Sequence, residues 1–423
     1  MLYERWRQVA QNFQNEFALH DFASGQRWTF AQLASMTESG EKPIGPIAFP
    51  EETSAEFVFS VLRAWRFGQI VFPLEAGKAT PALNHFPPKC VHFKLTSAST
   101  GESRAVAFTA KQLAADAGNI VSTMGLQHDS PNLGIISLSH SYGFSNLVLP
   151  LLLHGIPLVL AGSALPENVR RAGDQFGSIT LPAVPALWRA WLGADAIPKN
   201  TRLAISAGAP LPIELESAVF EKCGFKIHNF YGASECGGIA YDRSQRPRTD
   251  AALVGEPMDH VQLALDENGC LEVRGDAVGE TYWPGRNDAL CNSRFVTSDL
   301  AEIRDGKIYL MGRSGDQINI AGRKVSPEII ETALLAHPEV SDALVFGIPS
   351  EDADRSEDIV ACVAVNGRTT PELLKQFLLA KLPAWKVPRE WWFVESLQTN
   401  ARGKRSRLEW RQNYLKNKSA GDV

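Results

Sequence analysis

Short hydrophobic runs alternate with helical segments over about the first 250 residues. Strand-like runs are predicted at residues 134–138, 157–160 and 202–206. This alternation is typical of α/β layers, in which helices connect the strands of a largely parallel sheet. The pattern therefore predicts an α/β fold with multiple layers for this part of the chain.

The pattern of hydrophobic positions changes after residue 250. Short strand-like runs are predicted at residues 262–265, 270–274, 301–304 and 307–311. Asn268-Gly269 and Asp305-Gly306 separate neighbouring runs, and Asn-Gly and Asp-Gly are strong signals for hairpin turns. We therefore expect the large domain to end in a β-rich part.

A polar stretch at residues 312–316 precedes a restart of the pattern. The elements expected after it are a helix at 327–337, strands at 343–347 and 359–365, and an amphipathic helix at 371–382. Pro327 suits the first turn of the helix that it opens. We predict a large N-terminal domain, residues 1–314, and a small α+β C-terminal domain, residues 315–423.

Composition narrows the class of protein. Hydrophobic residues make up 44% of the 423 residues and charged residues 21%, as in ordinary globular proteins. A net charge of -5 disfavours nucleic-acid binding. The six cysteines form no CxxC pair, which favours reduced thiols over a zinc site or a disulfide framework. The longest apolar stretch, residues 147–153, is too short to cross a bilayer, so we expect a cytoplasmic protein.

A loop rich in hydroxyl residues, LTSASTGESR, occupies residues 95–104 between an apolar run and a helix candidate at Lys111. Backbone N–H groups and hydroxyls in such a loop can bind phosphate oxygens. A solvated turn is the alternative interpretation, and the P-loop motif GxxxxGK[ST] is absent. The loop alone leaves both interpretations open.

Five further motifs follow this loop in order. They are SAGAP at 206–210, YGASE at 231–235, VTSDL at 296–300, GRSGDQINIAGRKVSPEIIE at 312–331 and NARGKRSR at 400–407. The succession resembles the AMP-forming adenylating superfamily, which includes acyl-CoA and aryl-CoA synthetases, peptide-synthetase adenylation domains and luciferases. The resemblance extends from residue 18 to residue 407. It implies ATP-dependent activation of a carboxylic acid, with transfer to the thiol of coenzyme A or of a carrier protein's phosphopantetheine.

The resemblance assigns catalytic roles to two residues. Glu235 would bind Mg²⁺, a cation that prefers carboxylate oxygen. Lys404 would be the catalytic lysine supplied by a mobile C-terminal domain, and Gly315 would be the hinge. The alternatives are a solvated acid for Glu235 and a solvated basic tail for residues 402–407.

The resemblance also assigns nucleotide contacts. Tyr231 would stack on adenine opposite Gly208, Asp299 would bind the ribose hydroxyls, and Arg313 would lie beside ribose and phosphate. A core tyrosine, a turn-capping aspartate and a surface ion pair are the corresponding alternatives. The full set of implied nucleotide-binding residues is Thr96, Ser97, Ser99, Thr100, Gly101, Arg104, Gly208, Tyr231, Gly232, Ser234, Asp299 and Arg313.

The implied acid-binding segment is SHSYGF at residues 139–144. His140, Tyr142 and Gly143 would contact the acid together with Ala207, although His140 could also be a core histidine. Relatives that activate amino acids carry an aspartate in this segment, and residues 139–146 contain no acidic residue. We therefore expect an aryl or acyl acid without an amino group.

Several positions depart from the usual family pattern. Relatives usually have Gly, Pro, Lys and Gly at the positions of Ala98, Ser103, Arg104 and Ser298. Arginine keeps the positive charge of lysine but presents a planar fork. The departures leave a nucleotide- or acyl-binding protein without turnover as an alternative, and a luciferase-like oxygenase is a second one. The presence of Glu235, Asp299 and Lys404 together favours the ligase.

Overall fold

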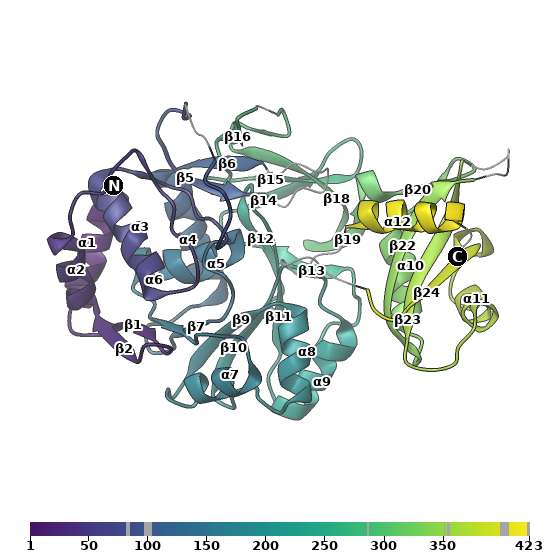
Figure 1. Cartoon of the computed structure of the whole chain (residues 1–423), viewed down its shortest axis with the longest axis horizontal. Coiled ribbons are helices and arrows are strands. Elements are labelled where there is room, and N and C mark those ends of the chain that lie inside the picture. The colour runs from purple at the N-terminus through teal and green to yellow at the C-terminus, as the bar shows by residue number, and fades with distance from the viewer. Residues whose placement is uncertain are drawn as a thin grey trace. The chain divides into compact units, whose positions relative to one another are not determined.

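The computed structural model of the chain is shown in Figure 1. It describes residues 1–81, 85–96, 104–285, 287–350, 352, 356–397 and 406–420. Two compact units are present. Unit 1 comprises Met1–Ala264, Glu272–Thr297 and Ile303–Tyr309, and unit 2 comprises Leu265–Leu271, Ser298–Glu302 and Leu310–Val423. The predicted boundary between residues 314 and 315 marks where the mobile C-terminal domain would begin, and it stays a prediction.

Capping residues define the helices of unit 1. Thr29 and Thr109 each form a capping box with the glutamine three residues later, at the start of α2 (Phe30–Ser39) and α4 (Ala110–Met124). Gly68, with φ 72°, ends α3 (Ala55–Phe67) in the left-handed conformation. Further helices are α1 (Leu2–Asn12), α5 (Ser141–Gly143), the π-helix η1 (Phe144–Val148), α6 (Leu149–His154), α7 (Pro166–Gly173), α8 (Pro185–Gly193) and α9 (Ile213–Cys223).

The main sheet of unit 1 is largely parallel, as the sequence predicts. Its order is β13-β12-β11-β10-β9-β7-β8-β1-β2, and the strands from β11 to β1 are parallel neighbours. The strand predicted at residues 134–138 is wrong in both bounds, because β7 begins at Asn132 and ends at Gly134. The strands are β1 (Phe17–Asp21), β2 (Gln26–Thr29), β7 (Asn132–Gly134), β8 (Leu158–Leu160), β9 (Ile179–Ala183), β10 (Thr201–Ser206), β11 (Ile227–Ala233), β12 (Gly237–Tyr241) and β13 (Leu253–Pro257).

A second sheet of unit 1 holds both ends of the hydroxyl-rich loop. Its order is β16-β6-β5-β4-β3, with bounds β3 (Ile47–Ala48), β4 (Ile70–Val71), β5 (Cys90–Leu95), β6 (Ala105–Thr109) and β16 (Thr281–Trp283). Strands β5 and β6 are antiparallel, and Leu95 pairs with Ala105. The loop at residues 96–104 therefore leaves and re-enters the sheet at adjacent positions.

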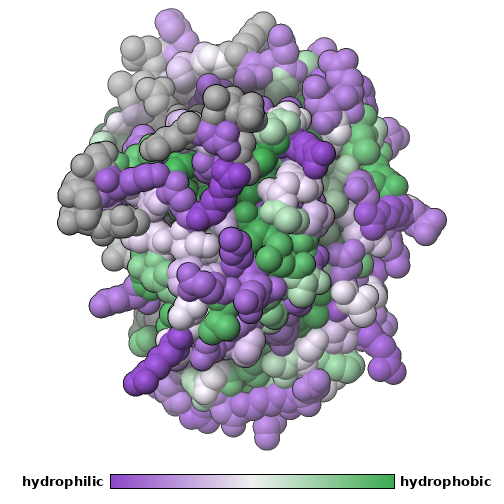
Figure 2. Space-filling model, turned by 90° about the vertical axis from the view of Figure 1, so that its right-hand side faces the viewer, coloured by the Kyte–Doolittle hydropathy of each residue, from purple (hydrophilic) through white to green (hydrophobic). Residues whose placement is uncertain are grey.

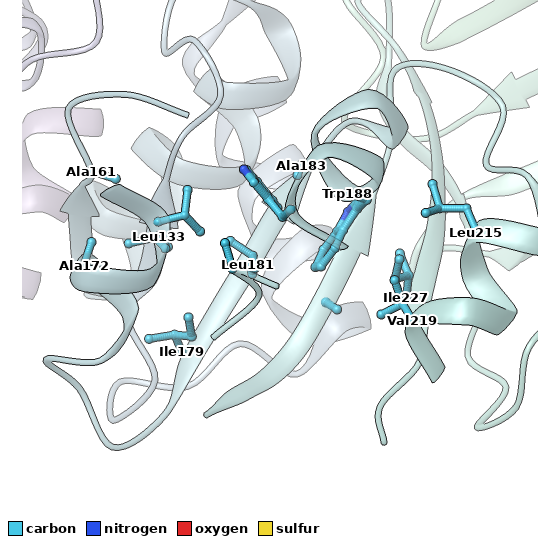
Figure 3. Close-up of a cluster of buried hydrophobic side chains, with 14 of the residues drawn as sticks. Leu133, Ala161, Ala172, Ile179, Leu181, Ala183, Trp188, Leu215, Val219 and Ile227 are labelled. Carbon is cyan, nitrogen blue, oxygen red and sulfur yellow. The ribbon is translucent and has the colours of Figure 1, made fainter. Parts of the chain in front are cut away.

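Helices α7, α8 and α9 pack one face of the main sheet. Figure 3 shows Leu181 of β9 and Ile227 of β11 facing the side chains of these helices. Trp188 and Trp191 of α8 are fully buried, and their indole N–H groups donate to the carbonyl oxygens of Ile205 and Ala164 at 3.2 and 2.9 Å. Large buried side chains whose N–H groups are hydrogen-bonded stabilise the core that supports the strand ends.

The β-rich part contains the predicted hairpins. Its strands are β14 (Gln262–Leu265), β15 (Cys270–Arg274), β17 (Leu290–Cys291), β18 (Arg294–Arg304) and β19 (Lys307–Arg313), and their residues are divided between the two units. Asp305 and Gly306, between β18 and β19, both have positive φ, as a primed hairpin turn requires. The hairpin prediction at Asp305-Gly306 is confirmed.

Unit 2 is an α+β body with its own core. Strand β22 is antiparallel to β23, and β24 is parallel to β23. Alternate residues of β22 point to opposite faces, so Val345 packs with α10 and α11 while Phe346 packs with Tyr414 of α12. The elements are β20 (Ile318–Ile320), β21 (Arg323–Val325), α10 (Pro327–Leu335), β22 (Val340–Pro349), β23 (Glu357–Val365), α11 (Pro371–Leu379), β24 (Glu390–Val394) and α12 (Arg407–Ala420).

One face of the molecule carries mostly polar side chains. Figure 2 shows a face on which hydrophilic residues predominate and hydrophobic residues form separate groups among them. Such a mixture is ordinary for a folded protein. Among the helices of the described ranges, none has the length and apolar character that a membrane crossing requires.

Candidate active site

The carboxyl ends of the parallel strands carry several of the predicted site residues. Ala207 and Gly208 follow β10, and Tyr231 lies near the end of the adjacent strand β11. Gly208 has φ 86°, a left-handed conformation that favours glycine. Ligands of open α/β sheets bind at this edge. The sheet topology therefore places these predicted residues at one end of unit 1.

The predicted acid segment lies beside the same strands. Tyr142 packs on the hydrophobic cluster that contains Ala207 and Phe230, and the ring centroids of Tyr142 and Phe230 are 5.8 Å apart. The buried hydroxyl of Tyr142 has no hydrogen-bond partner among the described residues. Burial raises the pKa of this hydroxyl, so it stays protonated and can donate.

Gly143 has a structural explanation. A Cβ at this position would overlap with the carbonyl oxygen of Ser137, so the backbone approach itself requires glycine. His140 is half exposed, and its Nε2 lies 3.6 Å from Oε1 of Glu75. Glu75 comes from another part of the chain, and sequence reasoning missed this acid because it considered residues 139–146 alone.

Glu235, the predicted metal ligand, is held by a neighbour from β16. The hydroxyl of Tyr282 donates to Oε1 of Glu235 at 3.0 Å, and the N–H of Gly279 donates to the carbonyl oxygen of Glu235 at 2.8 Å. Burial, together with Glu235, raises the pKa of Tyr282. Tyr282 therefore remains a donor and orients the carboxylate.

The donor set around Glu235 suits Mg²⁺ that arrives with phosphates. Within the described ranges, no group of three or more His, Cys, Asp or Glu could hold a metal ion. Mg²⁺ in nucleotide sites is bound by one or two carboxylates plus phosphate oxygens and water, so a single oriented carboxylate is sufficient. The guanidinium of Arg104 lies over the Tyr282 ring, 5.9 Å from its centroid, and adds positive charge close to Glu235.

The start of the hydroxyl-rich loop is tied to its end and to the YGASE motif. Both the backbone N–H and Oγ1 of Thr96 donate to the carbonyl oxygen of Arg104, at 2.8 and 3.2 Å. Ser234 Oγ donates to the carbonyl oxygen of Leu95 at 3.2 Å. The structure therefore brings Thr96, Arg104, Ser234 and Glu235 together. Ser97, Ser99, Thr100 and Gly101 lie outside the described residues.

Gly232 is explained by the turn that follows β11. A Cβ on Gly232 would lie 2.7 Å from the carbonyl oxygen of Gly237, so a side chain would collide with the antiparallel partner strand. This glycine therefore serves the close approach of β11 and β12. Its predicted contact with nucleotide stays a prediction.

Asp299 and Arg313 belong to unit 2 and form an ion pair. Nε of Arg313 donates to Oδ1 of Asp299 at 3.0 Å. Gly315 lies in a 3₁₀ helix, Ser314–Asp316, outside the left-handed region and with no neighbour within 4 Å of a Cβ. The ribose contacts and the hinge stay predictions, and Lys404 lies outside the described residues.

Arg407, at the end of the NARGKRSR motif, is held by ion pairs that sequence reasoning missed. Its guanidinium donates to both carboxylate oxygens of Glu331, at 2.9 and 2.8 Å, and to Asp316 Oδ2 at 2.7 Å. The side chain is 19% exposed. Arg407 is therefore anchored in unit 2 and is not part of a solvated tail. No local pattern pairs it with acids some 76 and 91 positions away.

Two families of sequences match this chain. The AMP-binding enzyme family matches residues 87–289, and the AMP-binding enzyme C-terminal domain matches residues 329–404, which together exceed half of the chain. The chain belongs to the AMP-forming adenylating superfamily. Membership confirms the predicted family, and relatives that are 2-succinylbenzoate–CoA ligases confirm the predicted class of enzyme, an AMP-forming ligase that activates a carboxylic acid.

Named relatives and solved structures agree with this placement. The chain is 28% identical to the 2-succinylbenzoate–CoA ligase of Bacillus cereus (strain ATCC 10987 / NRS 248) over 75% of this chain and 69% of the relative. ATP-bound MatB from Rhodopseudomonas palustris has a TM-score of 0.84 at 19% identity, over 98% of this chain and 99% of that one. MenE from Bacillus subtilis with the acyl-adenylate OSB-AMP has a TM-score of 0.83 at 20% identity, over 96% and 97%. These likenesses confirm the predicted fold class.

Proposed function

We propose that this enzyme uses MgATP to convert an aryl or acyl carboxylic acid into its acyl-adenylate and then transfers the acyl group to coenzyme A. The observation that carries the proposal is the junction of Arg104, Tyr282 and Glu235 at the end of the hydroxyl-rich loop. This junction combines a cation, a fixed donor and an oriented carboxylate, which MgATP requires.

In the first step, an oxygen of the substrate carboxylate attacks the α-phosphorus of ATP and pyrophosphate leaves. The reaction needs no protein nucleophile, so the enzyme accelerates it by positioning and by stabilising negative charge. Glu235 would hold Mg²⁺ on the phosphates and Lys404 would approach the α-phosphate. Asp299 and Arg313 would bind the ribose, in place of their present ion pair with each other.

In the second step, the thiol sulfur attacks the carbonyl carbon of the acyl-adenylate and AMP leaves. Rotation about Gly315 would withdraw Lys404 and admit the thiol. Coenzyme A is the proposed acceptor because the Bacillus cereus relative named above is a CoA ligase. The thiol of a carrier protein's phosphopantetheine would attack the acyl-adenylate in the same way, and it is the alternative acceptor.

An aryl acid is the favoured substrate. The Bacillus cereus relative is a ligase of 2-succinylbenzoate, an aryl acid, and Tyr142 and Phe230 would offer such an acid an aromatic surface beside Ala207. The free hydroxyl donor of Tyr142 could bind a polar substituent of the acid. Glu75 already pairs with His140 in this region, so a substrate ammonium would compete with the imidazole for it.

The test of this proposal is product analysis by mass spectrometry. The purified chain is incubated with MgATP, an aryl or fatty acid, and either coenzyme A or a phosphopantetheinylated carrier protein. The proposal expects AMP and an acyl-CoA in equal amounts. If the carrier protein alone is acylated, the acceptor is the carrier protein and not coenzyme A. Formation of no thioester with either acceptor would contradict the proposal.

A further inference from the structure

Unit 1 contains a buried cluster of Lys94, Asp116 and Ser145 that the reaction above does not use. Lys94 Nζ donates to Asp116 Oδ2 and to Ser145 Oγ, both at 2.9 Å, and Ser145 Oγ donates to the same Oδ2 at 2.6 Å. The side chains of Lys94 and Asp116 are each 1% exposed. Removing two charges from water costs about as much as their attraction returns, so stability alone explains such a pair poorly.

Lys94 and Ser145 come from two different segments of the candidate site. Lys94 lies in β5, directly before Leu95, where the hydroxyl-rich loop begins. Ser145 lies in the π-helix η1, immediately after the acid segment that carries Tyr142. Isolated π-helical turns are frequent at functional sites. The hydrogen bond from Lys94 to Ser145 therefore joins the loop to the acid segment.

Asp116 extends the cluster to a third segment. It lies in α4, and a Cβ on Gly237 would overlap with its carboxylate, so the carboxylate is packed directly against the Gly237 backbone. Gly237 has φ 71° and follows Glu235 by two residues. The position of the Glu235 loop therefore depends on where Asp116 sits, and Lys94 and Ser145 determine that.

Lys94 and Asp116 carry the charge of this region. Burial and Lys94 lower the pKa of His92, which is stacked on Phe144 and is neutral. The second oxygen of Asp116, Oδ1, makes no hydrogen bond with the described residues. Losing Lys94 would therefore leave a buried carboxylate with Ser145 as its one hydrogen-bond donor among them.

We propose that Lys94, Asp116 and Ser145 form a positioning cluster that fixes three segments relative to one another during adenylation: the start of the hydroxyl-rich loop, the Glu235 loop and the acid segment. The inference rests on the proposed function for its catalytic consequence. The three side chains are too buried to touch substrate, so they act through Thr96, Glu235 and Tyr142.

Lys94→Met is the first test, because it keeps the length of the side chain and removes the charge. A displacement of about 1 Å at a reacting centre can cost ~10²-fold in rate, so kcat for acid-dependent ATP–pyrophosphate exchange should fall ~10–10²-fold. The KM values for ATP and for the acid should both change, because the segments that bind them share the cluster. A change in one KM alone would contradict the proposal.

A double variant, Lys94→Met with Asp116→Asn, separates positioning from stability. It leaves no unpaired charge in the interior, so its thermal stability should recover toward wild type. Exchange activity should stay low, because the cross-link between the segments is still missing. Recovery of activity together with stability would identify the cluster as a structural ion pair only and would overturn the proposal.

Lys226→Met is the matched control. Lys226 is a lysine of unit 1 that is 2% exposed and paired with Asp242 and Glu216, and it precedes β11 at the end far from Glu235. This variant should lose stability but keep kcat within about twofold, since the lost pair contacts no site segment. A loss of kcat equal to that of Lys94→Met would show that instability alone lowers the activity.

Hydrogen exchange measured by mass spectrometry tests the cluster without any substrate. In Lys94→Met and in the double variant, amides of residues 94–96, 141–148 and 231–238 should exchange faster than in wild type and in Lys226→Met. Unchanged exchange in these three segments would overturn the positioning role. Absence of pyrophosphate exchange in wild type would instead contradict the proposed function and leave this measurement to decide the cluster.

Discussion

Glu235→Gln changes one oxygen of a carboxylate to an amide nitrogen and removes one negative charge. The remaining side-chain oxygen can still accept the hydrogen bond from Tyr282 that is now 3.0 Å long. A hydrogen bond to a charged group contributes about 1.5–3 kcal/mol and a neutral one about 1 kcal/mol, so the free energy of unfolding should fall by only about 1 kcal/mol. The fold should therefore survive the substitution.

The catalytic loss in Glu235→Gln should be much larger than the loss of stability. Removing one preorganised electrostatic group typically costs ~10²–10³-fold in kcat, and an amide is a weaker ligand for Mg²⁺ than a carboxylate. We expect ATP–pyrophosphate exchange to fall by that factor and the half-saturating Mg²⁺ concentration to rise. Tyr282→Phe is the matched control: it keeps the charge and removes the orienting bond, so its loss should be roughly tenfold.

The assay is a Mg²⁺ titration of exchange rate for wild type, Glu235→Gln and Tyr282→Phe, with thermal unfolding of each followed by circular dichroism. Wild-type rates of pyrophosphate exchange by Glu235→Gln at low Mg²⁺ would show that Glu235 does not bind the metal. Unfolding of Glu235→Gln at the temperature of the assay would also contradict this role, because the carboxylate would then be needed for the fold.

The remaining predictions concern the second unit, the catalytic lysine and pH. Gly315→Pro should slow thioester formation more than adenylation, because it fixes φ at the hinge, and equal loss in both half-reactions would count against a hinge there. Lys404→Ala should slow adenylation ~10²–10³-fold, yet it should transfer the acyl group from supplied acyl-adenylate to the thiol at nearly the wild-type rate. Unimpaired pyrophosphate exchange in this variant would remove Lys404 from the mechanism. Burial, beside Arg5 and His128, lowers the pKa of His154 to about 4, so the folded state disfavours its protonation. Stability should therefore decline as pH falls from about 6.5 to about 4. Urea titrations of His154→Gln should show a smaller decline, and an unchanged slope would contradict this.

Local patterns predicted much of the fold because they depend on neighbouring residues. The Asp305-Gly306 turn requires positive φ at both positions, and the sequence pattern identified it. Thr109 caps α4 through Gln112, and the helix accordingly begins next to the predicted start at Lys111. The strand at β7 was misplaced because Ile135 and Ile136 extend the apolar run beyond the last paired residue, Gly134.

The candidate site could be predicted only where residues share a motif. The YGASE motif identifies Glu235 as a candidate, but Tyr282, which orients it, lies 47 residues away in β16. Lys94 reads as one polar residue in an apolar strand until the fold places Asp116 and Ser145 around it. Partners of this kind are joined by tertiary packing, and no periodicity or spacing in one sequence specifies them.

Acid-dependent exchange of labelled pyrophosphate into ATP measures formation of the acyl-adenylate, the first half-reaction. Wild-type enzyme with Mg²⁺ is assayed against a panel of aryl acids, fatty acids and amino acids, with a reaction without acid as the blank. We expect exchange above the blank with at least one aryl or acyl acid and none without Mg²⁺. Folded protein that shows no exchange with any member of the panel, or exchange with amino acids alone, would contradict it.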